Sequence, residues 1–422
     1  MKKFFVSLGL AAAGTAGLHA AYAPDSPDPS KDWSLSATLR GFYDDNYTTT
    51  PQKQGSLGFE ATPTFSLNAP LQQTEIGLRY TYGLYYYQER ENNGENPIDQ
   101  THQFNFWLDH AFTPRWEGRI EDTFVVSQDP TLTPTGQVTP WRVEGNSLAN
   151  TVNTSMRTEW TRQFSTVLSA QNTVANYEQS DGTAQNPSYA GLLNRVEATF
   201  GLELQWVFSP TTTGLIGYQF GLVDFTGNEP IAPGPSGSGP YMSDSRNNQS
   251  HYGYVGVQHD FLDNLKGVAK VGVQYTEYVN DPSSSSSLGP YADASMIYTY
   301  ASGSYAQLGV TQSRNTTTTV QINSSGQITQ DQESTVAYGS INQLLTPKLT
   351  ASLVGHFQYS VYNDGYYNSQ SAEFYNLGVN LSYAFTRHFS SDLGYNFDWY
   401  TTPVPGQEYT RNRVYLGVTA TY

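Results

Sequence analysis

Glutamate and arginine residues recur two positions apart in several stretches, and these charges are the best candidates for chemistry. In Glu117, Arg119 and Glu121 the spacing puts all three side chains on one face of a β-strand. Facing carboxylates and guanidinium groups either neutralise one another across neighbouring strands or, beside water, create a transverse field that orients polar solutes. The sequence leaves both interpretations open. The predicted set is Glu60, Glu75, Arg79, Glu117, Arg119, Glu121, Arg157, Glu159, Arg195, Glu197, Glu203, Arg411 and Arg413.

Aromatic residues fall on the same face as these charges. Tyr85, Tyr87, Trp107, Tyr252 and Tyr254 could form an aromatic track, because the apolar faces of sugar rings pack on aromatic rings. The alternative is chance placement, since the chain holds 32 Tyr.

The histidines do not predict an enzyme. Asp109-His110 and His259-Asp260 are adjacent, and adjacent strand residues point to opposite faces, so neither pair forms a dyad. His110 and His259 each lie two residues before a Phe that flanks a turn, which predicts a structural role. We find no Ser-containing nucleophile motif beside a His, no His cluster and no Cys, so we expect no catalytic residue, metal or cofactor.

Strict alternation of apolar and polar residues predicts the strands that carry these side chains. In 33–40 the residues Trp33, Leu35 and Leu39 share one face. The last ten residues follow the same alternation, and Val414, Leu416, Val418 and Tyr422 share one face up to the end of the chain. A terminal strand of a soluble β-sandwich would also alternate. An unsheltered apolar strand favours a closed barrel instead, because closure removes the exposed edge.

Eight short turns with a flanking apolar pair separate the strands into hairpins. Long polar segments alternate with these turns, and this asymmetry is typical of outer-membrane barrels. Eight turns predict nine hairpins and therefore 18 strands; weak alternation in 295–312 leaves 16 as an alternative. The turns are 68–70, 112–116, 160–164, 208–210, 261–265, 300–305, 345–349 and 385–389, and the long segments include 88–100, 128–150, 178–192, 226–249, 280–290 and 315–332.

Composition and the amino terminus support a secreted membrane protein. Lys2 and Lys3 precede an apolar stretch from Phe4 to Leu18, which predicts a signal peptide at 1–20, a spacer at 21–32 and a barrel at 33–422. Mean hydropathy is -0.50, and beyond the signal no run approaches the roughly 20 apolar residues of a membrane helix. The net charge of -16 excludes a basic nucleic-acid surface. A secreted β-propeller is the rival fold, but it needs four strands per repeat, and we find two.

Taken together, the signal, the alternating hairpins and the terminal aromatic strand resemble Gram-negative outer-membrane porins, specifically the "putative β-barrel porin" group. The resemblance implies an all-β, transmembrane, antiparallel up-and-down barrel for passive diffusion of small hydrophilic solutes or ions, without a cofactor. It also implies contact with outer-membrane lipid. It further implies that the barrel-assembly machinery recognises the terminal strand through Val414, Leu416, Val418 and Tyr422.

Two expectations concern the loops and the assembly. Segments 128–150 and 226–249 are long enough to fold inward, and the resemblance favours the first as the pore-narrowing loop; a surface loop is the alternative. Porins are often homotrimers, although no patch in the sequence indicates a contact between copies. The rival function is a surface scaffold or adhesin with a blocked lumen and ligand-binding loops.

Overall fold

The computed structural model describes residues 32–129, 131–132, 138–143, 145–235, 239–281 and 285–422. The predicted signal peptide at 1–20 lies outside these residues, as does all of the 21–32 spacer except Asp32.

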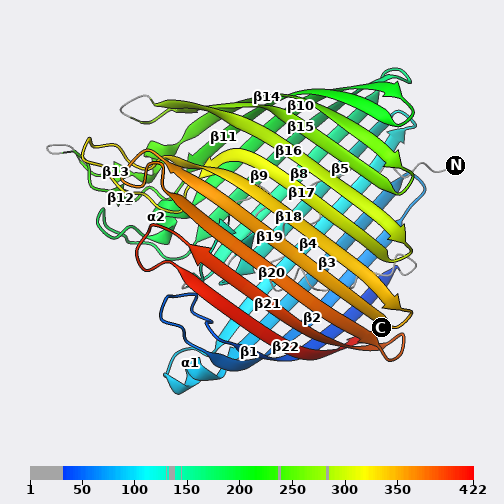
Figure 1. The fold of residues 1–422 in the computed structure, drawn as a ribbon, viewed down its shortest axis with the longest axis horizontal. Helices are drawn as coiled ribbons and strands as arrows, with labels where there is room; N and C mark the ends of the chain where they lie inside the picture. The colour runs from blue at the N-terminus through cyan, green and yellow to red at the C-terminus, as the bar shows by residue number, and fades with distance from the viewer. Residues whose placement is uncertain (1–31, 130, 133–137, 144, 236–238, 282–284) are drawn as a thin grey trace.

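Eighteen antiparallel strands form one closed barrel, each paired with its neighbours in chain order (Figure 1). The strands are β1 (Trp33–Asp44), β2 (Ser56–Pro70), β3 (Thr74–Tyr87), β4 (Ile98–Thr113), β5 (Trp116–Ser127), β8 (Ser147–Glu159), β9 (Phe164–Tyr177), β10 (Arg195–Ser209), β11 (Thr212–Phe225), β14 (Asn248–Leu262), β15 (Leu265–Tyr278), β16 (Ser286–Ala301), β17 (Ser304–Thr316), β18 (Asp331–Thr346), β19 (Leu349–Asn363), β20 (Ser371–Ala384), β21 (Phe389–Thr401) and β22 (Tyr409–Thr421).

Pairing between the first and last strands closes the barrel. β1 and β22 pair from Ser36 and Thr421 to Asp44 and Arg413, and the rings of Trp33 and Tyr422 lie 5.4 Å apart beside this seam. The predicted count of 18 strands is therefore confirmed, and the alternative of 16 is wrong. The weakly alternating region supplies β16 and β17, which pair regularly except for one irregularity beside their turn.

Short turns lie at one end of the barrel and long loops at the other (Figure 1). Seven of the eight turns lie where the sequence predicts them. The turn expected at 68–70 is displaced, because β2 continues to Pro70 and the turn is Leu71–Gln73. Pro70 is tolerated as the last strand residue, where the missing N–H costs no interior ladder bond.

The long loops contain the remaining secondary structure: α1 (Gln88–Asn92), β6 (Thr131–Leu132), β7 (Val138–Thr139), α2 (Tyr189–Leu193), β12 (Pro230–Ala232), β13 (Tyr241–Met242) and η2 (Ser243–Arg246). Among the described residues, no helix is both long and apolar enough to cross a membrane.

A repeated contact organises the short-turn end. The ring of Phe208 covers Gly214, six residues later on the next strand, so closely that a Cβ there would collide with it. Phe112 covers Gly118 in the same way, and Phe261 covers Gly267. The missing side chain of Gly at this spacing lets these three Phe rings pack directly on the barrel wall.

Apolar side chains face outward along the strands. Leu39, Phe59 and Leu416 expose 58%, 48% and 63% of their surface, a pattern opposite to that of a soluble protein. The largest buried apolar cluster lies instead among the long loops and the strand ends that meet them. The inner face of the barrel is polar, and it positions the candidate site.

Candidate pore and its constriction

The strand register places the predicted charged set on the inner face of the barrel. Glu60 faces Arg40 on β1 and Tyr85 on β3, and Glu117 faces Arg157 on β8. Each alternates with exposed apolar residues, such as Phe59 beside Glu60 and Ile120 beside Glu121. The inner face holds two groups of charges with different surroundings.

The charges nearer the short turns remain open to water. Arg119 contacts Glu121 at 2.9 Å and Asp109 at 3.7 Å, yet the side chains of Arg119 and Asp109 keep 39% and 40% of their surface exposed. Arg157 and Glu159 lie 3.5 Å apart and are also partly exposed. We call Glu75, Arg79, Asp109, Glu117, Arg119, Glu121, Arg157 and Glu159 the inner vestibule.

The charges nearer the long loops are buried in ion pairs. Glu60 accepts from Arg40 at 2.7 Å and from Arg413 at 3.0 Å, and Arg40 also reaches Asp392 at 2.6 Å. Arg411 pairs with Asp44 at 2.6 Å. Arg195 pairs with Glu197 at 2.6 Å. These groups neutralise one another, because charges removed from water need close partners.

The loop at 128–146 is called the constriction loop below, and its described residues, 128–129, 131–132, 138–143 and 145–146, include several that contact inward side chains of the barrel wall. Arg142 donates to Asp99 of β4 at 2.6 Å and to Asp129 at 3.4 Å, while its backbone N–H donates to Thr49 Oγ1 at 2.6 Å. Asp129 in turn lies 3.7 Å from Arg411 of β22. Burial alone would lower the pKa of Arg142, but Asp99 and Asp129 outweigh burial and raise it.

The same loop also reaches strands at the end of the chain. Tyr409 of β22 donates its hydroxyl proton to the Pro140 carbonyl, and the ring of Trp141 lies 6.1 Å from that of Tyr400 on β21. Trp141 and Val143 are buried. The prediction that this segment folds inward is therefore confirmed.

Other loops pack beside it. Leu192 and Leu193, Ile231 and Ala232, and Val320 and Ile328 belong to one buried cluster, with Trp141 and Val143, called the loop core below. Ile231 and Ala232 of segment 226–249 thus pack in the loop core at the long-loop end of the barrel.

Arg246 joins three of these loops without a carboxylate. Its guanidinium donates to the Thr317 carbonyl at 3.0 Å and to the Leu192 carbonyl, and it lies 4.0 Å from the centre of the Phe225 ring. Burial, and then repulsion from Arg195, lowers the pKa of Arg246 to about 9. The side chain therefore stays charged at neutral pH and ties the loops together through backbone carbonyls.

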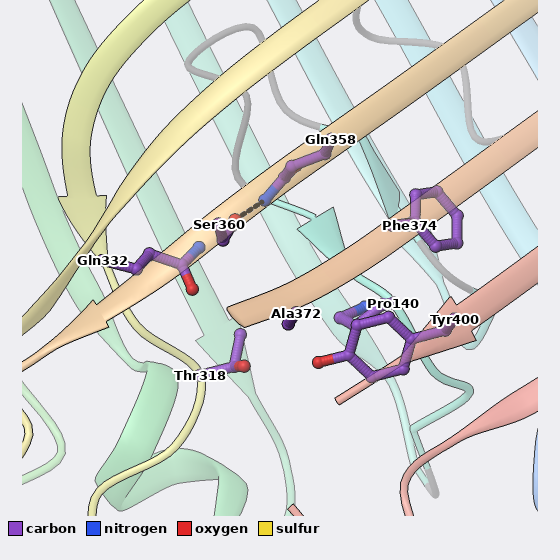
Figure 2. Close-up of a pocket in the computed structure, with 8 residues that line it drawn as sticks. All are labelled: Pro140, Thr318, Gln332, Gln358, Ser360, Ala372, Phe374 and Tyr400. Atoms are coloured by element: carbon purple, nitrogen blue, oxygen red, sulfur yellow. Dashed lines mark hydrogen bonds between the residues drawn. The ribbon is translucent and has the colours of Figure 1, made fainter. Parts of the chain in front are cut away.

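A small open-sided cavity of about 20 Å³ lies where Pro140 of the constriction loop meets β18, β19, β20 and β21 (Figure 2). Within it, Gln358 Nε2 donates to Ser360 Oγ at 2.9 Å. Uncharged amide and hydroxyl groups thus lie beside aromatic rings at this narrow place. Its lining is Pro140, Thr318, Gln332, Gln358, Ser360, Ala372, Phe374 and Tyr400.

The charge pattern of the sequence does not point to this lining, because none of the lining residues is charged. The available signal was weaker: Gln332, Gln358 and Ser360 are polar at inward positions of the neighbouring strands β18 and β19. Pro140 and Thr318 meet them only through loop folding, which no periodicity reveals.

The predicted aromatic track divides in the structure. Tyr85 and Tyr87 are 7% and 0% exposed and pack with Phe42, Tyr47 and Tyr415, so their faces are not open to a solute. This part of the prediction is corrected: the rings support the outer ion pairs, and Arg413 lies 5.6 Å from the Tyr85 ring centre.

The other aromatic candidates remain on the barrel wall. Trp107 is partly exposed, and its ring lies over Gly77 on the neighbouring strand. The ring of Tyr254 lies over Gly217 in the same way, and its hydroxyl donates to Glu203, which pairs with Lys270 at 2.7 Å. Tyr252 contacts the ring of Tyr291 at 5.4 Å.

The histidines occupy the structural places that the sequence predicted. Asp109 faces the lumen beside Arg119, whereas His110 bonds Thr74 Oγ1 at 2.7 Å and packs on Phe112 at 4.4 Å. His259 repeats the arrangement, 2.9 Å from Thr212 Oγ1 and 4.7 Å from Phe261. Within the described ranges, no three His, Asp or Glu side chains gather as a metal site.

Several solved structures are similar to this chain, at TM-scores below 0.5. No curated protein matches the chain in sequence. Among solved structures, Acinetobacter baumannii OccAB4 is similar at 11% identity and a TM-score of 0.42, covering 94% of this chain and 100% of that one. Pseudomonas aeruginosa OccK1 (OpdK) is similar at 10% identity and a TM-score of 0.43, covering 93% and 99%.

The family model described as "Putative beta-barrel porin 2" matches residues 35–422, nearly the whole of the described chain. The family match, the closed barrel and the outward apolar band together place the protein in the bacterial outer membrane. The short turns are then periplasmic, the long loops extracellular, and lipid surrounds the strands. The chain therefore belongs to the putative beta-barrel porin 2 family.

Proposed function

We propose that this porin-like barrel conducts small hydrophilic solutes and ions by passive diffusion, with a preference for cations. The observation that carries the proposal is the inner vestibule, where the carboxylates of Glu75, Asp109, Glu117, Glu121 and Glu159 outnumber the guanidinium groups of Arg79, Arg119 and Arg157. Carboxylates that keep their exposure to water raise the local concentration of cations.

Lysines elsewhere on the wall do not offset this excess. Lys266 and Lys270 lie on β15, and each pairs with a carboxylate, Asp260 at 3.5 Å and Glu203 at 2.7 Å. The constriction loop and its uncharged cavity then limit the size of solutes that pass.

The test is the reversal potential of single channels in a planar bilayer under a salt gradient. We expect cation preference, and we expect a triple variant Glu75→Gln, Glu117→Gln, Glu159→Gln to lose most of it, because three exposed charges disappear. Glu373→Gln is the matched control, since Glu373 lies at the loop end of β20, away from the vestibule. Equal selectivity in all three proteins would contradict the acidic vestibule.

A second candidate function is a surface scaffold whose lumen is blocked, and the buried loop core favours it. Arg246→Met distinguishes the two functions. It keeps the apolar length of the side chain but removes the donors to Leu192 and Thr317, so the loops loosen. A diffusion channel should then show at least about twofold more frequent or larger openings. A folded wild type and a folded variant that are both silent would favour the scaffold.

We also propose that the barrel-assembly machinery recognises the outward face of β22. Val414, Leu416, Val418 and Tyr422 are 47%, 63%, 55% and 68% exposed. This exposure leaves them accessible to a partner before insertion.

A further inference from the structure

A second group of charges lies on the inner wall, on strands that carry no vestibule residue. Lys270 of β15 stands directly opposite Asp293 of β16 in the strand register. The Lys270 ammonium nevertheless pairs with Glu203 of β10, at 2.7 Å. The Lys270 side chain runs across Gly256 of β14, where a Cβ would lie only 3.1 Å from Lys270 Cγ. The glycine on β14 therefore lets the ammonium reach Glu203 and leave Asp293.

Asp293 is left without a cation of the protein. In the part of the chain that the structure describes, no Lys, Arg or His forms an ion pair with its carboxylate, and its Oδ1 is buried without a hydrogen-bond partner. The side chain as a whole is only partly buried, so the lumen can reach it. A buried acceptor that the protein does not satisfy costs free energy until a donor is supplied. Asp293 therefore offers an acceptor to a group that enters the lumen.

Aromatic rings border the two carboxylates. The Tyr254 hydroxyl donates to Glu203 at 3.0 Å, and Lys270 Nζ lies 5.1 Å from the centre of the Tyr254 ring. Tyr291 lies two residues before Asp293 on the same face, and its ring centre is 5.6 Å from that of Tyr254. An ammonium group is attracted both by a carboxylate and by the face of an aromatic ring. Lys270 thus shows that this wall already holds one ammonium group.

We infer that this part of the wall, called the amine site below, binds the ammonium group of an organic amine in the lumen. Lys270 fills the half of the site at Glu203, and the half at Asp293 offers a carboxylate beside the Tyr291 ring. One ammonium group balances the charge that Lys270 leaves over. A divalent metal is disfavoured, because it needs several oxygen ligands and Lys270 repels it. The inference rests on the proposed function, since solutes must enter the lumen, and it names the class that the wall retains. The site consists of Glu203, Tyr254, Lys270, Tyr291 and Asp293.

The first test measures the binding of n-butylammonium to the folded barrel in detergent by saturation-transfer NMR, which needs no conductance. We expect Asp293→Asn to weaken binding by about fivefold, because it removes the charge and keeps the shape. Glu373→Gln, at the loop end of β20, is the matched control and should bind like the wild type. The uncharged probe 1-butanol should not distinguish the proteins. Heat-modifiable migration on a denaturing gel checks that each variant barrel is folded.

The second test separates a binding site from a merely structural ion pair. Lys270→Met keeps the apolar length of the side chain but frees Glu203, so it should bind a second equivalent of butylammonium, seen as a larger signal at saturation. Adding Asp293→Asn to this variant should return the signal to one equivalent. Equal affinities in the wild type and Asp293→Asn, no gain in Lys270→Met, or displacement of butylammonium by an equal concentration of Mg²⁺ would each overturn the inference.

The outcome for the amine site can be told apart from the outcome for the proposed function. A barrel that conducts ions in the bilayer but binds no butylammonium would support diffusion and overturn the amine site. A barrel that is silent in the bilayer yet binds butylammonium through Asp293 would overturn passive diffusion and support the site.

Discussion

At the residue scale, the same pairing of Arg with Glu has two outcomes that depend on burial. Arg413 and Glu60 are almost completely buried and neutralise each other, whereas Arg119 and Glu121 stay partly exposed to water. The sequence leaves two roles open for these charges, mutual neutralisation and action on polar solutes. Each role therefore has suitable residues, at opposite ends of the lumen. Hydration decides between them, because a buried pair is stabilised only by its partner and an exposed charge still acts on mobile ions.

Glu178 shows how a single carboxylate holds the constriction loop. The backbone N–H of Asn146 donates to it at 3.0 Å and the Asn146 amide donates at 3.0 Å, and these bonds lower the pKa of Glu178. A carboxyl with a lowered pKa in the folded state contributes stability above its unfolded pKa of about 4.3, and that contribution is lost as the pH falls through the lowered value.

We therefore predict that acid loosens the end of the constriction loop. Below about pH 4, the amides of 138–146 should lose protection against hydrogen exchange in the wild type, measured relative to the intrinsic exchange rate at each pH, because protonated Glu178 no longer accepts both bonds. Glu178→Gln should show faster exchange already at pH 7 and a weaker change on acidification. A variant with the same pH response as the wild type would refute this role for Glu178.

At the element scale, three hairpins carry a Gly under a turn-flanking Phe ring. The sequence shows this spacing, since Phe112, Phe208 and Phe261 each precede a Gly by six positions. Trp160 repeats the spacing with Thr166, to which its indole N–H donates at 3.0 Å. The contact fixes how the periplasmic ring of aromatic side chains lies on the wall.

We predict that Gly214→Ala destabilises the barrel by about 1–3 kcal/mol, because a Cβ at this site overlaps the Phe208 ring. Gly253→Ala is the matched control, as a Cβ there meets nothing within 4 Å. Urea unfolding from lipid vesicles measures the free energy of both variants. Equal stabilities would show that the ring moves aside without cost.

The long loops behave differently from the hairpins. Residues 128–146 carry no periodic pattern, yet Arg142 and Asp129 join them to β4 and β22. The sequence supported an inward fold through loop length and family resemblance, not through the residues that make the contacts. The sequence likewise places Tyr85 and Tyr87 on an open track, since nothing local indicates that Phe42, Tyr47 and Tyr415 bury them.

At the scale of the whole molecule, closure of the barrel puts the polar residues of each alternating strand in the lumen and the apolar residues on the lipid side. The pairing of β1 with β22 gives every strand two neighbours, so the backbone donors and acceptors of the barrel wall are satisfied within lipid. The pairing of β5, β8 and β9 places Asp122, Asn150 and Asn172 near one another on the outer surface.

The sequence by itself determined the strands, their number and the face of each side chain, because a period of two follows from local backbone geometry and turn residues mark each reversal. Tertiary contacts set which inward charges meet water and which loop contacts the inner wall. Those outcomes depend on contacts between residues tens or hundreds of positions apart, such as Asp129 with Arg411. Strand register and loop packing set these contacts, and neither produces a periodic pattern in the sequence.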